Sequence, residues 1–210
     1  MATTESSHAK HLYTRIVIVI AVFIALNTAA WLWGDHYVRF LLPVYQWSFE
    51  TLTHHYKVQS LRIEQENGER IIKVRAQTAG VRQLAGKSVP GGVPVSSSTL
   101  AGHALQHVIV LFAAIVLWPV RRWWGRLVLT ALAVSALLLV EALDVPLVLA
   151  GALEDLVLFN VDETLLSSSC LVQGMHLMNS GGRLALSLIA AALCVAVWRM
   201  AENGVRNPER

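Results

Sequence analysis

Long apolar runs alternate with two polar segments along this chain. Between Gly102 and Val145, two apolar runs flank a basic, tryptophan-rich turn, RRWWGR. Each run approaches the roughly 20 residues that a helix needs to cross a bilayer, and neither carries a strong charge at its centre. The pattern therefore predicts a transmembrane hairpin with helices over 102–120 and 127–145 and a cytoplasmic turn over 121–126.

Two further apolar runs predict transmembrane helices over 15–33 and 182–200. Tryptophans close both runs, as expected at a membrane interface. Basic residues collect in the tails 1–14 and 201–210 and in the turn, so the positive-inside rule places both termini in the cytoplasm. Arg183, at the outer end of the last run, is the exception. A secretory signal peptide is the alternative for the first run, because small residues lie near its end.

The first outer segment, 34–101, begins with aromatic and apolar residues spaced by three and four. This spacing predicts an amphipathic helix over 34–56, interrupted by Pro43 and lying on the outer membrane surface. Its tyrosines, Tyr37, Tyr45 and Tyr56, are expected to join the aromatic belt at that surface. The second outer segment, 146–181, is too polar to cross the membrane. We expect Pro146 to kink or end the preceding helix, with short outer helices after it.

Residues 57–78 predict a β-hairpin around Asn67-Gly68, since both central positions of a type I′ turn need positive φ. This turn pairs Ile63 with Ile72 and Leu61 with Val74, while a Gly- and Pro-rich loop with short strands at 81–84 and 93–96 follows. A lone hairpin is marginal in water, so its apolar face must lie on the preceding helix, a later loop or a partner. The predicted partner-binding residues are Leu61, Ile63, Asn67, Gly68, Ile72 and Val74.

The composition agrees with a membrane protein. Of 210 residues, 55% are hydrophobic and 15% charged, too apolar for an ordinary soluble domain. The fold class that follows is a mainly α membrane protein with four transmembrane helices, a small outer β-hairpin insert and interfacial helices. No room remains for a separate catalytic domain. The net charge of +3 is explained by topology, so the expected partners are the bilayer and other membrane or envelope proteins, and no nucleic acid.

Four ionisable residues of the hairpin lie away from its basic turn: His103, His107, Glu141 and Asp144. If the turn is centred on Trp124, His107 is level with Glu141, and His103 nearly level with Asp144. The structural interpretation is that hydrogen bonds between them tie two spans together. A zinc or iron site is the alternative, and the set Cys170, Met175, His176 and Met178 would suit copper. No cofactor other than such a metal is expected.

A catalytic role is the remaining alternative for these residues. His107 or His176 would act as the base, and the nucleophile would be Cys170 or a serine of the Ser96–Ser98 run.

The order of elements resembles that of exosortase-type membrane proteins and of the small membrane proteins encoded beside them. These elements are an N-terminal anchor, an outer β-hairpin, a Ser/Thr-rich approach to a span and a helical bundle. The resemblance implies a cysteine at the outer start of a span, an arginine in a later span and a histidine in the last. Here that start is Ser98-Thr99-Leu100, and the next span carries Glu141 and Asp144. The resemblance therefore indicates an accessory or degenerate relative.

Together these patterns predict a non-enzymatic accessory or assembly subunit of a complex in the bacterial inner membrane. Its outer hairpin and loops would bind the partner. An exosortase-like peptidase or transpeptidase and a metal-binding membrane protein remain the alternatives.

Overall fold

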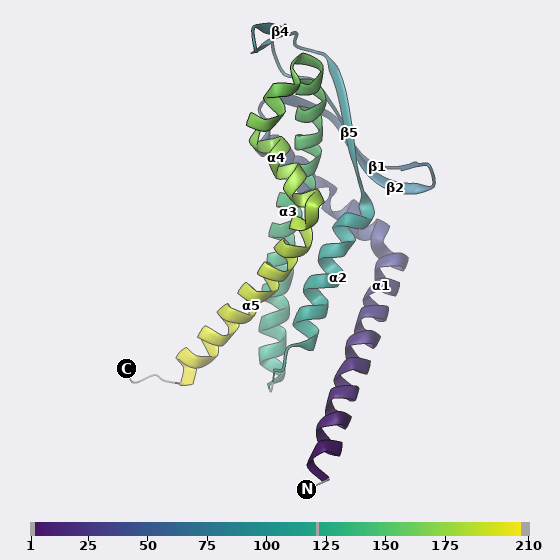
Figure 1. Cartoon of the computed structure of the whole chain (residues 1–210), viewed down its shortest axis with the longest axis vertical. Coiled ribbons are helices and arrows are strands. Elements are labelled where there is room, and N and C mark those ends of the chain that lie inside the picture. The colour runs from purple at the N-terminus through teal and green to yellow at the C-terminus, as the bar shows by residue number, and fades with distance from the viewer. Residues whose placement is uncertain (1–2, 121, 207–210) are drawn as a thin grey trace.

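The computed structural model describes residues 3–120 and 122–206; Arg121 of the predicted turn and the ends of both predicted tails lie outside them. A helical bundle carries a small β-sheet at one end (Figure 1). The helices are α1 Thr3–Leu52, α2 Ala101–Leu117, α3 Trp123–Val161, α4 Cys170–Leu177 and α5 Arg183–Arg206, with a 3-10 helix η1 at Glu163–Ser168 and a π-helical turn η2 at Met178–Gly182. The strands are β1 Tyr56–Glu66, β2 Glu69–Thr78, β3 Arg82–Leu84, β4 Lys87–Val89 and β5 Pro94–Leu100.

Three helical stretches are long and apolar enough to cross a membrane: Ile16–Leu52, Trp123–Val161 and Cys170–Asn203. The fourth predicted span corresponds to α2, a shorter apolar helix of 17 residues. These helices suit a multi-pass membrane protein. The 39 residues of α3 measure about 58 Å, well beyond a hydrocarbon core of about 30 Å, so one end of this helix extends past the apolar layer.

The predicted surface helix over 34–56 is not a separate element. It continues the first apolar run within α1, and Pro43 lies inside this helix without ending it. Val38, Leu41, Tyr45 and Phe49 are buried in a core formed with the sheet and α3. The spacing of three and four residues was correctly interpreted as an amphipathic helix, but its buried side packs on the protein itself rather than on the bilayer.

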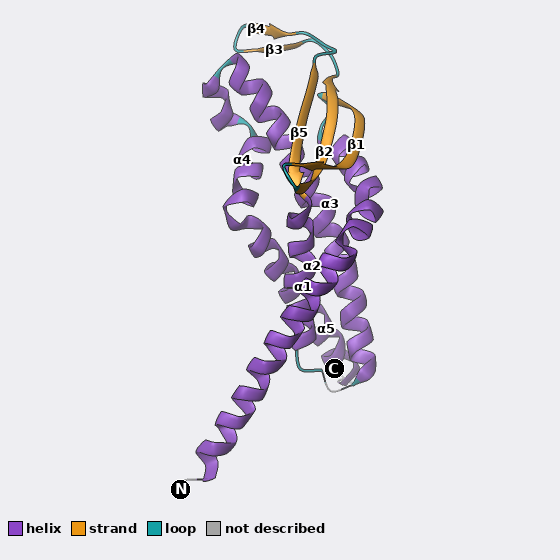
Figure 2. Cartoon of the chain, turned by 90° about the vertical axis from the view of Figure 1, so that its right-hand side faces the viewer, coloured by secondary structure: helices purple, strands orange, loops and turns teal. Residues whose placement is uncertain are grey.

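The first half of α1 has a different environment. Its most apolar window is unburied within the chain, and the helix diverges there from the other helices (Figure 2). Apolar side chains such as Phe23 and Ile24 are more than half exposed, which suits contact with lipid.

The sheet has the antiparallel order β1-β2-β5. Its hairpin register is the predicted one, with Ile63 opposite Ile72 and Leu61 opposite Val74. Asn67 and Gly68 have φ values of 53° and 82°, as a type I′ turn requires. A third strand lies beside the hairpin, because the whole length of β5 pairs with β2. This strand leads directly into α2, so the sheet is joined to the bundle without a linker.

Helix α3 passes through Pro146 and continues to Val161, so of the two expected effects of Pro146, ending the helix is wrong. The continuation lies beside α4, and the two helices approach closely at Gly151. A Cβ atom at this position would lie 2.5 Å from the carbonyl oxygen of Leu171.

A second core, which includes Leu111, Leu129 and Ala191, joins α2, α3 and α5 at the other end of the bundle.

Candidate functional site: a buried polar network between the helices and the sheet

The network lies where the apolar part of the bundle meets the sheet. Glu141 follows the start of α3 at Trp123 by 18 residues, about 27 Å along the helix axis and close to the thickness of a hydrocarbon core. His107 of α2, Glu141 and Asp144 of α3, and Arg183 of α5 are all less than 5% exposed. Charged groups at such a depth must be paired within the protein.

His107 joins α2 to both α3 and α5. Its Nε2 lies 3.0 Å from Oδ2 of Asp144, and its Nδ1 lies 2.7 Å from Oγ of Ser187. The ring therefore bonds Asp144 rather than Glu141, which the sequence predicts to be level with His107. Asp144 lies about one helical turn further along α3 than Glu141. Helix α2 ends at Leu117 and α3 begins at Trp123, so the turn is not centred on Trp124.

Arg183 supplies the positive charge that balances Asp144. Its Nε donates to Oδ1 of Asp144 at 3.1 Å, and one terminal nitrogen donates to Oγ1 of Thr99 at 3.4 Å. The two ring nitrogens of His107 thus lie against Asp144 and Ser187. The Ser187 hydroxyl has one proton, and both Nδ1 of His107 and the carbonyl oxygen of Arg183 lie within hydrogen-bond distance of it.

Glu141 belongs to a separate pair of contacts with α1. The hydroxyl of Tyr45 donates to one of its carboxylate oxygens at 2.6 Å, and the hydroxyl of Tyr37 donates to the other at 3.1 Å. Tyr45 is fully buried, so the expectation that it belongs to the aromatic belt is wrong. The two tyrosines instead hold an acidic side chain inside the bundle.

A similar arrangement lies further out along α3, at Glu154. Arg82 of β3 donates to both carboxylate oxygens, at 2.8 and 2.7 Å, and the hydroxyl of Tyr56 donates at 2.6 Å. The hydrogen bond to Glu154 raises the pKa of Arg82, and burial together with the same carboxylate raises the pKa of Tyr56. Beside this cluster lies a cavity of about 290 Å³, with His54 and His55 in its wall.

The four predicted metal ligands do not meet as one set. His107 contacts Asp144, while Glu141 contacts tyrosines and Nδ1 of His103 lies 3.4 Å from Oγ1 of Thr99. Among the described side chains, those of residues 16–120 and 122–203, no group of three or more His, Cys, Asp or Glu residues is placed to hold a metal ion. In the predicted soft-ligand set, Cys170 is exposed and Met175 is buried.

The hydrogen bonds join Ser187 to His107 and His107 to Asp144, as a serine nucleophile, a base and a carboxylate are joined in a catalytic triad. Their exposed fractions are 1%, 0% and 0%, so a substrate does not reach the serine in this conformation. The serine is also oriented toward its own helix, since its hydroxyl lies 3.0 Å from the carbonyl oxygen of Arg183. The arrangement can tie three helices together, but it lacks access for acyl transfer.

The predicted partner-binding residues separate into three groups by burial. Asn67 and Gly68 are exposed at the tip of the hairpin, whereas Ile72 and Val74 are fully buried in the chain's own core. Leu61 and Ile63 are half-buried against that core. Ile72 and Val74 are therefore inaccessible to an outside partner, whereas Asn67 and Gly68 are accessible.

Several residues of the network were not predicted from the sequence. In the sequence, Arg183 stands out only as an exception to the positive-inside rule. A lone arginine at the end of one span, level with two carboxylates on another span, is a usable signal for an ion pair between the spans. Tyr37 and Tyr45 carry no such signal, because tyrosines eight residues apart are equally expected on a membrane-facing helix.

No protein-family model matches this chain, and no curated protein or solved structure matches it either.

Proposed function

We propose that this chain is a non-enzymatic accessory or assembly subunit of a complex in the bacterial inner membrane, and that it binds its partner through the outer hairpin and loops. The buried ionisable groups support a structural role for the bundle. Among the described residues, every fully buried side-chain nitrogen and oxygen has a hydrogen-bond partner, so the bundle interior presents no unsatisfied polar group to a substrate.

In this proposal α1, α2, α3 and α5 all cross the membrane, and both termini are cytoplasmic. The distribution of side chains supports that topology. Trp123, Trp124 and Arg122 lie at the end of the bundle away from the sheet, together with Trp198 and Arg199 of α5. Tryptophan and arginine at one end favour the cytoplasmic interface there and a periplasmic sheet at the other end.

The observation that carries the proposal is the free edge of β1. This strand has 11 residues, and within the described part of the chain no strand pairs with its outer edge. The opposite edge strand, β5, is held against α3, where Ser97 donates to the carbonyl oxygen of Leu149. A long free edge is a template for a strand of another chain, and soluble proteins usually cover or shorten such edges.

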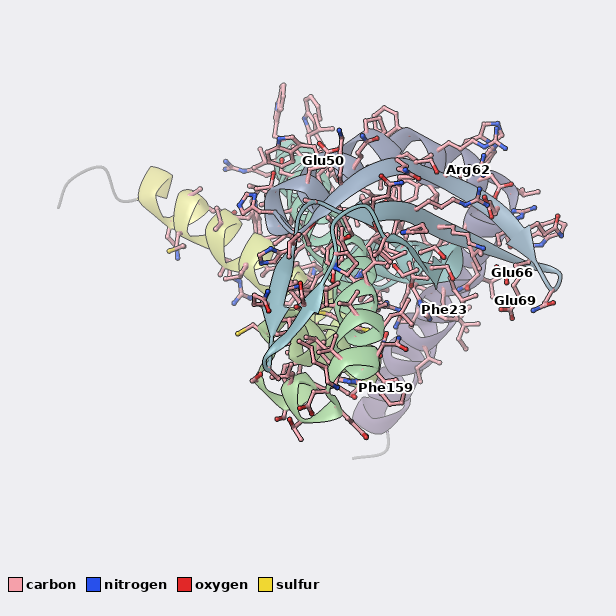
Figure 3. All side chains as sticks on the ribbon, turned by 90° about the horizontal axis from the view of Figure 1, so that it is seen from above. Phe23, Glu50, Arg62, Glu66, Glu69 and Phe159 are labelled. Atoms are coloured by element: carbon pink, nitrogen blue, oxygen red, sulfur yellow. The ribbon has the colours of Figure 1, made fainter. Side chains whose placement is uncertain are left out.

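The outer face of the sheet defines the charge of the partner. Glu64 lies among three cations, with distances of 2.7 Å to Arg62, 3.0 Å to Arg75 and 3.7 Å to Lys73. Arg62 and Arg75 are about half exposed, so around Glu64 three cations face one carboxylate, and Lys73 also contacts Glu66 at 3.4 Å. In Figure 3 the hairpin extends sideways beyond the helices, with Glu66 and Glu69 at its tip. We therefore expect an extended partner segment with acidic side chains.

The test is recovery of the partner from native membranes in mild detergent, followed by mass spectrometry. Arg62→Glu is expected to reduce that recovery strongly, because it places like charges across the interface. Arg39→Glu, at an exposed position on α1, is the matched control and is expected to leave recovery unchanged. Unchanged recovery with Arg62→Glu, or equal loss with both variants, would contradict the proposal.

An exosortase-like activity remains a second candidate because of the Ser187, His107 and Asp144 arrangement. It requires the bundle to open at Ser187. Loss of an envelope phenotype in Ser187→Ala, with normal protein level and normal partner recovery, would favour this enzyme over the accessory subunit.

A further inference from the structure

The membrane-facing surface of the bundle contains a groove between α2 and α5. Its volume is about 570 Å³, and its lining includes Ala114, Trp118, Ala191, Ala192, Val195 and Arg199. The groove exists because α5 has alanines at successive positions here, whose methyl groups do not fill the space beside α2. From Leu188 to Arg199 it extends about 16 Å along the helix axis.

One end of this groove is polar. The guanidinium of Arg199 stacks on the ring of Trp118, with 4.8 Å from its carbon to the ring centre. Among the side chains of residues 16–120 and 122–203, no carboxylate lies within ion-pair distance of Arg199. The neighbouring Arg126 differs, since it donates to the carbonyl oxygens of Ile115 and Val116 at the end of α2. Arg199 thus has donors available for an outside anion.

We infer that this groove binds an anionic phospholipid, with an acyl chain along the alanines of α5 and the phosphate at Arg199. A guanidinium donates two parallel hydrogen bonds to a phosphate, and a tryptophan beside it suits the headgroup level of a membrane. The charged residue in the lining of the groove is the cation Arg199, which favours an anionic over a zwitterionic headgroup. The inference depends on the membrane placement of α5 and not on the partner of the sheet.

The size of the groove suits one acyl chain of a lipid and not the full cross-section of a helix from another protein. A helix about 10 Å in diameter occupies roughly 1,200 Å³ over three turns, which is about twice the groove. A partner helix would also meet the charged end of Arg199 at the membrane boundary, where a phosphate offers a better acceptor than an apolar side chain.

The test uses native mass spectrometry of the full-length protein in detergent with added phosphatidylglycerol or phosphatidylcholine of equal chain length. We expect phosphatidylglycerol to bind about tenfold more tightly, a difference of about 1.4 kcal/mol. Arg199→Gln is expected to abolish this preference, and Arg199→Lys to retain most of it. Ala192→Leu fills the groove and is expected to weaken the binding of both lipids.

Two matched variants test the site itself. Arg122→Gln removes one charge from the same end of the bundle, where Arg122 lines a different hollow, and Ala185→Leu adds the same bulk to α5 away from the groove. Both are expected to bind like the unmodified protein. The inference would be overturned by equal loss of preference in Arg122→Gln, by retained preference in Arg199→Gln, or by unchanged binding in Ala192→Leu. All variants are compared at the same gel-filtration elution volume, so that an unfolded sample is not scored.

Discussion

Asp144 and Arg183, on α3 and α5, form an ion pair of 3.1 Å in which both side chains are at most 5% exposed. Asp144 uses its second carboxylate oxygen to accept from His107, so one acidic side chain holds two other helices. The pair explains why an arginine occurs on the side of the bundle where the positive-inside rule does not expect one.

Removing only one member of this pair is expected to destabilise the protein strongly. Arg183→Met leaves a buried carboxylate without its counter-charge, and a change of this kind costs about 3–5 kcal/mol. The measurement is thermal or denaturant unfolding in detergent. The double variant Arg183→Met with Asp144→Asn is expected to recover part of the loss, since it removes both charges. If the single variant were as stable as the unmodified protein, the ion pair would not be buried as described.

The two tyrosines that bind Glu141 are expected to contribute unequally. Tyr45→Phe removes the shorter hydrogen bond, 2.6 Å against 3.1 Å for Tyr37, and leaves a buried carboxylate oxygen unsatisfied. We expect a loss of about 1–3 kcal/mol for Tyr45→Phe and a smaller loss for Tyr37→Phe. Unfolding of both variants checks the order, and the reverse order would contradict the assignment of Tyr45 to the core.

The contact between α3 and α4 is expected to depend on Gly151. A side chain there would collide with the carbonyl of Leu171 and with Cβ of Met175, each 2.5 Å from the position of a Cβ atom. Gly151→Ala should therefore separate the helices and cost about 1–3 kcal/mol. Faster proteolysis between Asp162 and Ser169 would report the separation. Gly102→Ala is the matched control, because a Cβ atom there meets no atom within 4 Å.

The metal alternative is tested by elemental analysis of the purified protein. Because His103, His107, Glu141 and Asp144 bond to different partners, we expect less than one zinc, iron or copper per chain. One equivalent that disappears in both His103→Ala and His107→Ala would show that these ligands rearrange around a metal.

Local patterns were sufficient for the helical runs and for the hairpin, but not for where α1 and α3 end. The register of Ile63 with Ile72 follows from Asn67-Gly68 and from the alternation of side chains along a strand, both of which act between near neighbours. The apolar runs predicted helices because a span is defined by its own length and hydropathy. The sequence by itself thus determined the helical class, the hairpin and the end of the bundle at which polar groups gather.

The pairing of those polar groups was decided by the tertiary structure. A period of 3.6 residues shows that α1 has a buried side but not whether lipid or protein covers it, so Tyr45 was assigned to the membrane surface rather than to Glu141. Likewise, the depth of a residue along a span leaves its rotation around the helix axis open. The packing of α2, α3 and α5 sets that rotation, and it brings Asp144 to His107 and Arg183 while leaving Glu141 to α1.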